Sequence, residues 1–397
     1  MQMIRLTLFL AFSALAAAQA PAPLVWQMQE SGTTAGLRGI FSVDGTVAWA
    51  SGTGGSVLRT IDGGAHWTKC AVPDAATDGA TLDFRVVQAW DAKTAIVMSS
   101  GKGGLSRLYK TTDGCLHWKL LLHNPEKEGF WDTLYFMERW DGKSLGNTGY
   151  LLGDPVNGAF WLLISRDFGR NWIKQKGIGL QISVATQSVF AASNSSFVSR
   201  DGFPAFGSGG SGGAFVYSMT MTSICVDDCP PEHMNLDGKD DRWTPRRVPL
   251  GQNTDSSGIF SIGSRPASSV YPALSRVYVI VGGDYSNPNN SANTAAFQLA
   301  GNGEHWTAST IPPHGYRSAV QWSEALKVWI TVGTNGSDIS RDDGKTWQPL
   351  DDGNWNALSL PFVVGPNGRI AKMNSATLPD PALPAEPRPA KKSPWAK

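Results

Sequence analysis

The sequence carries almost no net charge and, beyond its first twenty residues, no apolar run long enough to cross a bilayer. Its 34 Lys and Arg residues nearly balance 33 Asp and Glu residues, so composition indicates neither a nucleic-acid partner nor an anionic membrane. Long helical periodicities are also scarce. What the chain has instead is 44 Gly, 24 Pro and 16 Trp, a composition that favours short strands joined by many turns.

Cysteine and histidine are too few and too scattered to predict a metal centre. Cys225 and Cys229 could close a tight loop, and Cys70 could meet Cys115 if the two lie on neighbouring units, but the sequence permits three pairings. Zinc is the alternative, although no Cys or His lies at the partner spacing. The acidic segment 225–241 lacks the EF-hand spacing, so we expect a solvated loop that could contact a partner. We therefore expect no metal and no cofactor.

The two ends of the chain differ from its middle. Residues 1–18 combine Arg5, an apolar run and a small-x-small site at Ala16 and Ala18, which predicts a secretory signal peptide that leaves Gln19 first in the mature chain. An uncleaved anchor is the alternative. Residues 376–397 are rich in Pro and predict a disordered tail. The protein is thus expected to be exported, to the periplasm or the medium, with residues 19–375 folded and no membrane span in the mature chain.

Four octapeptides repeat one pattern of side chains. They are TIDGGAHW, TTDGCLHW, SRDFGRNW and SRDDGKTW, and each stands between two short apolar stretches. The positions that recur are a hydroxyl, an aspartate two residues later, a glycine and a final tryptophan. The residues in question are Thr60, Asp62, Gly64 and Trp67; Thr111, Asp113 and Trp118, with Cys115 in place of glycine; Ser165, Asp167, Gly169 and Trp172; and Ser340, Asp342, Gly344 and Trp347.

This pattern is typical of a self-contained β-hairpin turn. Hydroxyl and carboxylate side chains can hydrogen-bond to nearby turn backbone, and glycine tolerates the positive φ that such turns require. The tryptophan begins the returning strand and can cover its own turn. The pattern therefore indicates architecture, because its carboxylate is already occupied by backbone N–H groups.

The octapeptides resemble the Asp box, or BNR repeat, of sialidase-like β-propellers, in which the box is structural. The order of further segments, among them GLRGIFSVDGTVAWASG, LLGDPVNG, VGGDYSNPN and GYRSAVQW, is similar to the photosystem II stability/assembly factor-like branch of these propellers, over residues 26–374. The resemblance implies a non-catalytic scaffold that binds another exported or membrane protein.

Counting the repeats predicts an all-β, seven-bladed propeller. The boxes recur at about 50 residues, which is a blade length, and the inner-strand candidates begin near residues 37, 83, 131, 185, 257, 316 and 355. The seventh unit lacks an outermost strand, which residues 23–29 could supply. We expect this N-terminal strand to close the ring and remove an exposed sheet edge.

Charged residues at the starts of these strands are binding candidates, together with Asp154, Asp284 and Tyr285, which lie further along their blades and could line a face or pack between blades. Inner strands line a propeller's centre and their ends converge on one face, where guanidinium groups could hold an anionic or polar partner. The alternative is that these charges pair with one another and stiffen the ring. The candidates are Arg38, Arg85, Asp132, Asp154, Asp284, Tyr285 and Arg317.

A sialidase-like glycoside hydrolase, or a glycan-binding protein, is the alternative function. Three arginines suit it, yet Arg38 is followed by Gly39-Ile40 rather than the Ile-Pro of those enzymes, and the sequence nominates neither a Tyr/Glu pair nor two matched carboxylates. The Gly-rich run 207–213 precedes a strand-like segment, so a blade loop is favoured over a dinucleotide site. We expect no catalytic residue.

Overall fold

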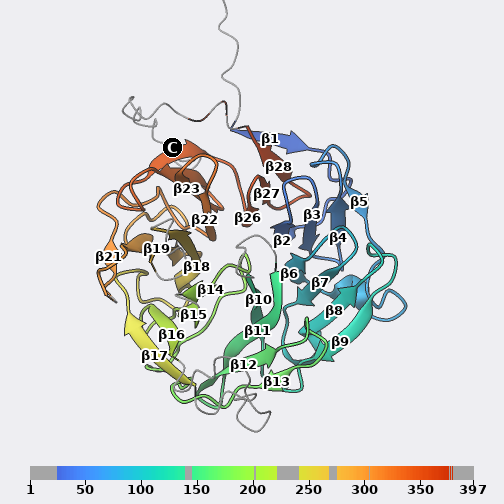
Figure 1. Cartoon of the computed structure of the whole chain (residues 1–397), viewed down its shortest axis with the longest axis horizontal. Helices are drawn as coiled ribbons and strands as arrows, with labels where there is room; N and C mark the ends of the chain where they lie inside the picture. Colours follow the sequence, from blue (N-terminus) through green and yellow to red (C-terminus); the bar gives the residue numbers. More distant parts are fainter. Residues whose placement is uncertain are drawn as a thin grey trace, which may run out of the picture.

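The computed structural model describes residues 25–138, 145–200, 203–220, 241–267, 275–303, 305–374, 376 and 378. The predicted signal peptide, Cys225 and Cys229, most of the acidic segment and almost all of the Pro-rich tail lie outside these residues. Figure 1 shows seven sheets arranged as the blades of a ring, so the predicted all-β, seven-bladed propeller is confirmed.

Each blade is a four-stranded antiparallel sheet, numbered here outward from the centre of the ring. In blade order the strands are β2 (Leu37–Ser42), β3 (Ala48–Gly52), β4 (Val57–Thr60) and β5 (Thr68–Lys69); β6 (Phe84–Ala89), β7 (Ala95–Ser99), β8 (Arg107–Thr111) and β9 (Lys119–His123); β10 (Trp131–Glu138), β11 (Leu145–Val156), β12 (Ala159–Ser165) and β13 (Ile173–Lys174); β14 (Phe197–Arg200), β15 (Phe203–Ser208), β16 (Phe215–Thr220) and β17 (Arg242–Arg247); β18 (Ser257–Pro266), β19 (Arg276–Asp284), β20 (Ala295–Gln298) and β21 (Thr307–Ala308); β22 (Ala319–Ser323), β23 (Val328–Gly333), β24 (Gly336–Ser340) and β25 (Gln348–Asp351); and β26 (Ala357–Ser359), β27 (Phe362–Val364), β28 (Ile370–Met373) and β1 (Trp26–Gln29).

Within the described ranges, two short 3₁₀ helices interrupt the all-β pattern, η1 (Gly79–Thr81) and η2 (Gly103–Leu105). In the described part of the chain, no helix has the length and apolar character needed to cross a membrane.

Apolar burial decreases from the middle of each blade to its rim. Every residue of β3, β7 and β23 is buried, whereas both residues of β5 and of β13 are exposed. Middle strands are covered on both faces by the neighbouring blades, which is why they are continuous runs such as AIVMS and VWITVG rather than alternating ones. The hydrophobic core thus lies between the blades.

The N-terminal strand completes blade 7, as the sequence predicts. β1 pairs antiparallel with β28 over its whole length, from Trp26 opposite Met373 to Gln29 opposite Ile370. Trp26 is buried against Trp355, with ring centroids 6.1 Å apart. The two ends of the described chain therefore meet in one sheet, visible where blue β1 lies beside red β28 in Figure 1.

Hydrogen bonds between backbone N–H groups and side-chain oxygens join the inner strands of adjacent blades and the segments next to them. Backbone N–H groups of one blade donate to side-chain oxygens of the next, which satisfies buried donors at the blade contacts. The pairs are Ser42 N to Ser359 Oγ (2.9 Å), Phe136 N to Gln88 Oε1 (2.9 Å), Leu134 N to Asn194 Oδ1 (2.8 Å), Val320 N to Ser261 Oγ (2.9 Å) and Leu360 N to Gln321 Oε1 (2.8 Å).

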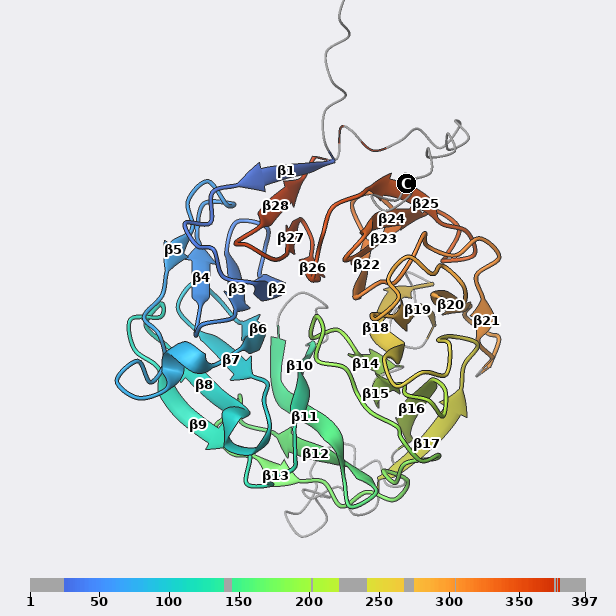
Figure 2. The ribbon, with the colours of Figure 1, turned by 180° about the vertical axis from the view of Figure 1, so that it is seen from behind.

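Blade 4 differs from the sequence prediction. Its inner strand is β14, which begins at Phe197, and not the segment 185–193. That segment is part of a long connection between β13 and β14, which runs to the middle of the ring in Figure 2. The apolar and polar residues of this segment do alternate, as in a strand. The segment nevertheless forms a single isolated β-bridge, from Ser188 to Gly209, and not a continuous ladder of strand pairs. We call residues 187–196 the channel strap.

Candidate functional site: an axial cluster on one face of the ring

A β-bulge recurs near the start of four inner strands, at the second residue of β2, β6 and β10 and at the fourth residue of β18. The register shifts between Leu37 and Gly39, Phe84 and Val86, Trp131 and Thr133, and Ile259 and Ser261. A bulge leaves one residue out of the ladder and redirects its side chain, and bulges are common beside functional sites. The residues so placed are Arg38, Arg85, Asp132 and Phe260, in blades 1, 2, 3 and 5. Sequence patterns located three of these positions but not the bulges that present them.

Two arginines at these bulges share one aspartate. Arg85 Nε donates to Asp83 Oδ2 at 2.9 Å, and Arg38 Nε lies 3.5 Å from Asp83 Oδ1. The Arg38 and Arg85 side chains remain 37% and 29% exposed, so both guanidinium groups still reach the surface. One carboxylate for two guanidinium groups leaves the trio with a net charge of +1. The sequence prediction missed Asp83, although it stands two residues before Arg85 in the segment DFR.

Asp132 and Asp154 form a buried carboxyl pair beside Arg85. Asp132 is 2% exposed and its Oδ2 has no hydrogen-bond partner, whereas Asp154 Oδ1 accepts from the backbone N–H of Val189 at 3.0 Å. Burial, followed by the charge of Asp154, raises the pKa of Asp132 well above its usual range, and Arg85 offsets this only in part. Burial also raises the pKa of Asp154 to about 6, against the lowering effect of the Val189 N–H.

Aromatic rings from the channel strap and blades 5 and 6 complete the cluster. Phe190 of the strap stacks on Phe260 with centroids 4.2 Å apart, and Tyr285 meets both rings edge-on at 6.4 and 6.1 Å. Tyr316 is buried against Phe260. Tyr285, by contrast, is 53% exposed and follows β19 directly. It presents a supported ring to solvent, near enough to Tyr316 to raise the pKa of that buried phenol further. We call Arg38, Asp83, Arg85, Asp132, Asp154, Phe190, Phe260, Tyr285 and Tyr316 the axial cluster.

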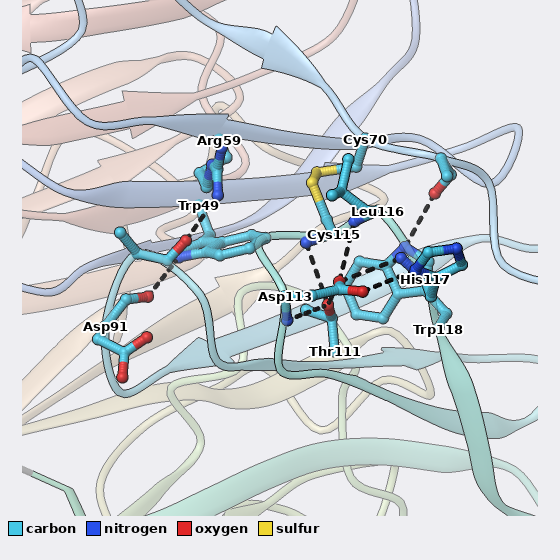
Figure 3. Close-up of a disulfide and its surroundings, with 12 residues drawn as sticks. Trp49, Arg59, Cys70, Asp91, Thr111, Asp113, Cys115, Leu116, His117 and Trp118 are labelled. Atoms are coloured by element: carbon cyan, nitrogen blue, oxygen red, sulfur yellow. Dashed lines mark hydrogen bonds and ion pairs between the residues drawn. A yellow bond between two sulfur atoms is a disulfide. The ribbon is translucent and has the colours of Figure 1, made fainter.

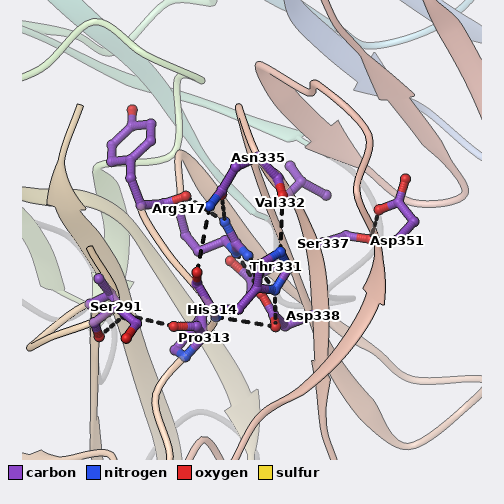
Figure 4. Close-up of polar contacts among 12 residues, drawn as sticks. Ser291, Pro313, His314, Arg317, Thr331, Val332, Asn335, Ser337, Asp338 and Asp351 are labelled. Carbon is purple, nitrogen blue, oxygen red and sulfur yellow. Dashed lines mark hydrogen bonds and ion pairs between the residues drawn. The ribbon is translucent and has the colours of Figure 1, made fainter. Parts of the chain in front are cut away.

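Two of the predicted binding residues serve the architecture instead. Arg317 is fully buried, donating from Nε to Asp338 Oδ2 at 2.6 Å, and His314 Nδ1 lies 2.7 Å from Asp338 Oδ1 (Figure 4). The backbone N–H of Val320 donates to Ser261, just as the N–H of Leu134 in blade 3 donates to Asn194. Arg317 stands three residues before Val320, and the buried Trp131 stands three residues before Leu134, so the two positions correspond. Arg317 therefore lies just before β22, at a buried position that corresponds to Trp131 and not to the bulge position of Arg38.

Asp284 is likewise satisfied locally. Its carboxylate accepts from Ser256 Oγ at 2.6 Å, from Thr254 Oγ1 at 2.9 Å and from the Ser286 N–H at 2.9 Å. Although burial opposes ionisation, these bonds hold the pKa of Asp284 below its usual range. Asp284 thus shapes the turn that carries Tyr285 and is not itself offered to a ligand.

The four octapeptides lie at the rim, where they join the third and outermost strands of blades 1, 2, 3 and 6. In blade 1, Thr60 Oγ1 donates to Asp62 Oδ1 at 2.8 Å and accepts the Gly64 N–H at 2.9 Å, while Asp62 Oδ1 accepts the His66 N–H at 2.9 Å. The same bonds recur in the other three turns. The carboxylates are thus occupied by their own turns, and none belongs to the axial cluster.

Cys115 takes the glycine position of the second turn and joins it to blade 1. Its φ is +68°, matching +88° at Gly64, +76° at Gly169 and +80° at Gly344. The structure links it to Cys70, with Cα atoms 5.3 Å apart, so the covalent bond crosses from the residue that directly follows β5 of blade 1 to the turn of blade 2 (Figure 3). Among the described residues, no group of three His, Cys, Asp or Glu side chains is placed to hold a metal ion.

Comparison with known proteins gives structural relatives only. No protein-family model matches the sequence, and no curated protein matches it. The structure described as "YCF48 bound to D1 peptide" is similar with a TM-score of 0.55 and 17% identity, covering 89% of this chain and 99% of that one. "YCF48 from Cyanidioschyzon merolae" gives a TM-score of 0.55 and 20% identity, covering 88% and 98%. At these identities the likeness establishes the seven-bladed propeller fold.

Proposed function

We propose that this protein is an exported, non-catalytic propeller that binds a segment of another exported or membrane protein at the axial cluster. In this role it would resemble the assembly factors of photosystem II. The observation that carries the proposal is the gathering of two partly exposed guanidinium groups and the exposed ring of Tyr285 on one face of a ring whose rim turns are self-satisfied. Exposed Tyr and Arg on a rigid scaffold are the residue types most often found at the centres of protein interfaces.

The structural relatives support the same reading. One of the two YCF48 structures is described as holding a D1 peptide, so a propeller of this fold has been captured with a polypeptide segment. The four octapeptide turns support kinship with Asp-box propellers. The partner of this protein has to be identified by experiment, because structural similarity at 17–20% sequence identity indicates the fold but not the binding residues.

Site-specific cross-linking tests this proposal. A photo-reactive phenylalanine analogue in place of Tyr285 is expected to capture one discrete protein in the exporting host, and Arg38→Ala with Arg85→Ala should abolish that capture. The matched control is the same analogue at Ile311, a rim residue that is 57% exposed. Equal capture at both positions, or none at Tyr285, would contradict the proposal.

Export itself is tested at the N-terminus. If residues 1–18 are a signal peptide, the protein recovered from the periplasm or medium begins at Gln19, as read by mass spectrometry of its first peptide. Retention in the cytoplasm with Met1 intact would contradict export and leave the binding proposal in place.

A glycoside hydrolase remains the second candidate because Asp132 and Asp154 are two carboxyl groups with raised pKa values on paired strands, a combination that acid–base cleavage uses. Against it, Asp132 is only 2% exposed. Turnover of aryl glycosides that is lost in Asp154→Asn and kept in Asp284→Asn would favour the enzyme.

A further inference from the structure

The channel strap is held across the centre of the ring by side chains of blades on both sides of it. Asn194 Oδ1 accepts from Thr133 Oγ1 of blade 3 at 2.9 Å, Ser195 Oγ donates to Ser261 Oγ of blade 5 at 2.7 Å, and Ser193 Oγ donates to the Ser318 carbonyl beside blade 6 at 2.6 Å. These contacts tether the C-terminal half of the strap. Since they involve hydroxyl, amide and carbonyl groups only, they do not respond to pH.

The N-terminal half of the strap is held by the backbone bridge between Ser188 and Gly209 and, in addition, by charged groups of blades 2 and 3. The Val189 N–H donates to Asp154, and the Ala191 carbonyl accepts from Arg85 Nη1 at 3.2 Å. Phe190, between these two residues, is the one that stacks on Phe260. Residues 189–191 of the strap are therefore held in part by Asp154 and by Arg85, which also belongs to the surface that carries Arg38.

Asp154 has a second buried carboxyl group as its neighbour. Asp132 lies beside it, nearly inaccessible to solvent and with one oxygen lacking any hydrogen-bond partner. Arg85 lowers the pKa of Asp132 in part, but this guanidinium is shared with Asp83, which also pairs with Arg38. Two neighbouring buried carboxyl groups are thus opposed by one guanidinium that acts on Asp132 and is already engaged, which is unfavourable when both carboxyl groups are ionised.

We propose that Asp132 and Asp154 form a proton-sensitive latch that holds the N-terminal half of the channel strap, and with it Arg85, in the closed position. When one carboxyl group carries a proton, the pair is stable under the strap. When both ionise, opening of the strap is favoured, because opening returns the two carboxylates to water.

The sign of the effect follows from proton linkage. The pKa of Asp154 is raised in the closed structure, so that structure binds a proton more tightly than an opened one with a hydrated carboxyl group. Closure is therefore favoured below the raised pKa, and the advantage is lost as the pH rises through about 6. Asp132, whose pKa is raised as well, acts in the same direction.

Hydrogen exchange of the intact protein measures the latch directly. After correction for intrinsic rates, peptides covering the strap should show an opening equilibrium that rises by about tenfold between about pH 5 and about pH 8, which is the part of the shift in the pKa of Asp154 that falls in this range. Peptides from β23 in blade 6 should show no such rise.

Two isosteric variants decide the outcome. Asp154→Asn keeps an oxygen for the Val189 N–H but cannot ionise, so it should abolish the pH dependence that Asp154 contributes. Asp132→Asn removes the second carboxyl group and should reduce the pH dependence without abolishing it. Asp62→Asn, in a rim turn, should leave it unchanged. A strap whose exchange is independent of pH in the wild type, or equally dependent in both variants, overturns the proposal. If Asp154→Asn does not fold, Asp132→Asn carries the test. No binding partner is needed, so the latch can fail while the proposed function stands.

Discussion

At the scale of single residues, the molecule separates arginines that stabilise the ring from arginines that face solvent. Arg317 and Asp338 are both fully buried and paired with each other, so removal of either leaves an uncompensated charge in the core. Arg317→Met is expected to lower the free energy of unfolding by about 3 to 5 kcal/mol. The double variant Arg317→Met with Asp338→Leu should lose less than Asp338→Leu alone. Urea unfolding monitored by tryptophan fluorescence gives the comparison, and equal losses in the double and single variants would contradict the pairing.

The aspartates of the rim turns make a prediction about acid. The backbone N–H of His66 holds the pKa of Asp62 at about 2, and the His117 side chain holds that of Asp113 at about 2. A pKa that is lowered by folding contributes stability above the unfolded value, and that contribution is lost as the pH falls through the folded value. The two turns should therefore persist down to about pH 4 and weaken between about pH 4 and pH 2. NMR titration of these carboxyl groups measures the midpoints. Midpoints at or above the ordinary value would contradict the turn geometry.

At the scale of elements, the Cys70–Cys115 bond joins two blades through a turn that elsewhere uses glycine. The bond closes a separation of 45 residues, so Cys70→Ser with Cys115→Ser should lower the free energy of unfolding by about 2 to 4 kcal/mol. The pair Cys70→Ser with Cys115→Gly should recover about 1 kcal/mol, since position 115 has a positive φ that glycine adopts without strain. Calorimetry of the three proteins tests this. A glycine variant no more stable than the serine variant would show that the turn relaxes instead.

The elements also show what the sequence could and could not reveal. Blade number, ring closure by β1 and the rim turns were predictable, because each depends on local turn chemistry or on apolar runs that repeat along the chain. Asp83 and the channel strap were not predictable, because their roles come from long-range contacts such as Arg85 with Ala191, which no periodicity encodes. The burial of Arg317 was not predictable for another reason. A shift of one residue in the alignment of the inner segments moves a side chain from the exposed bulge position to the buried position before it, and the sequence motif does not fix that alignment.

At the scale of the whole molecule, closure of the ring depends on the pairing of the first described strand, β1, with the last, β28. Gln27 lies opposite Lys372 in the β1–β28 ladder, although the two residues are separated by almost the entire chain. Gln27→Cys with Lys372→Cys should therefore form a disulfide, identified by mass spectrometry of the linked peptides. Because the loop so closed is very long, oxidation should raise the free energy of unfolding by about 4 kcal/mol or more over the reduced form. The matched control, Gln27→Cys with Gln348→Cys, pairs β1 with a strand of blade 6 that does not adjoin it in a sheet, and should form no internal bond. Cross-linking in the control, or its absence in the test pair, would show that head and tail do not share a blade. The ring would then be open, and the inner strands that converge on the axial cluster would lose the closure that holds them together.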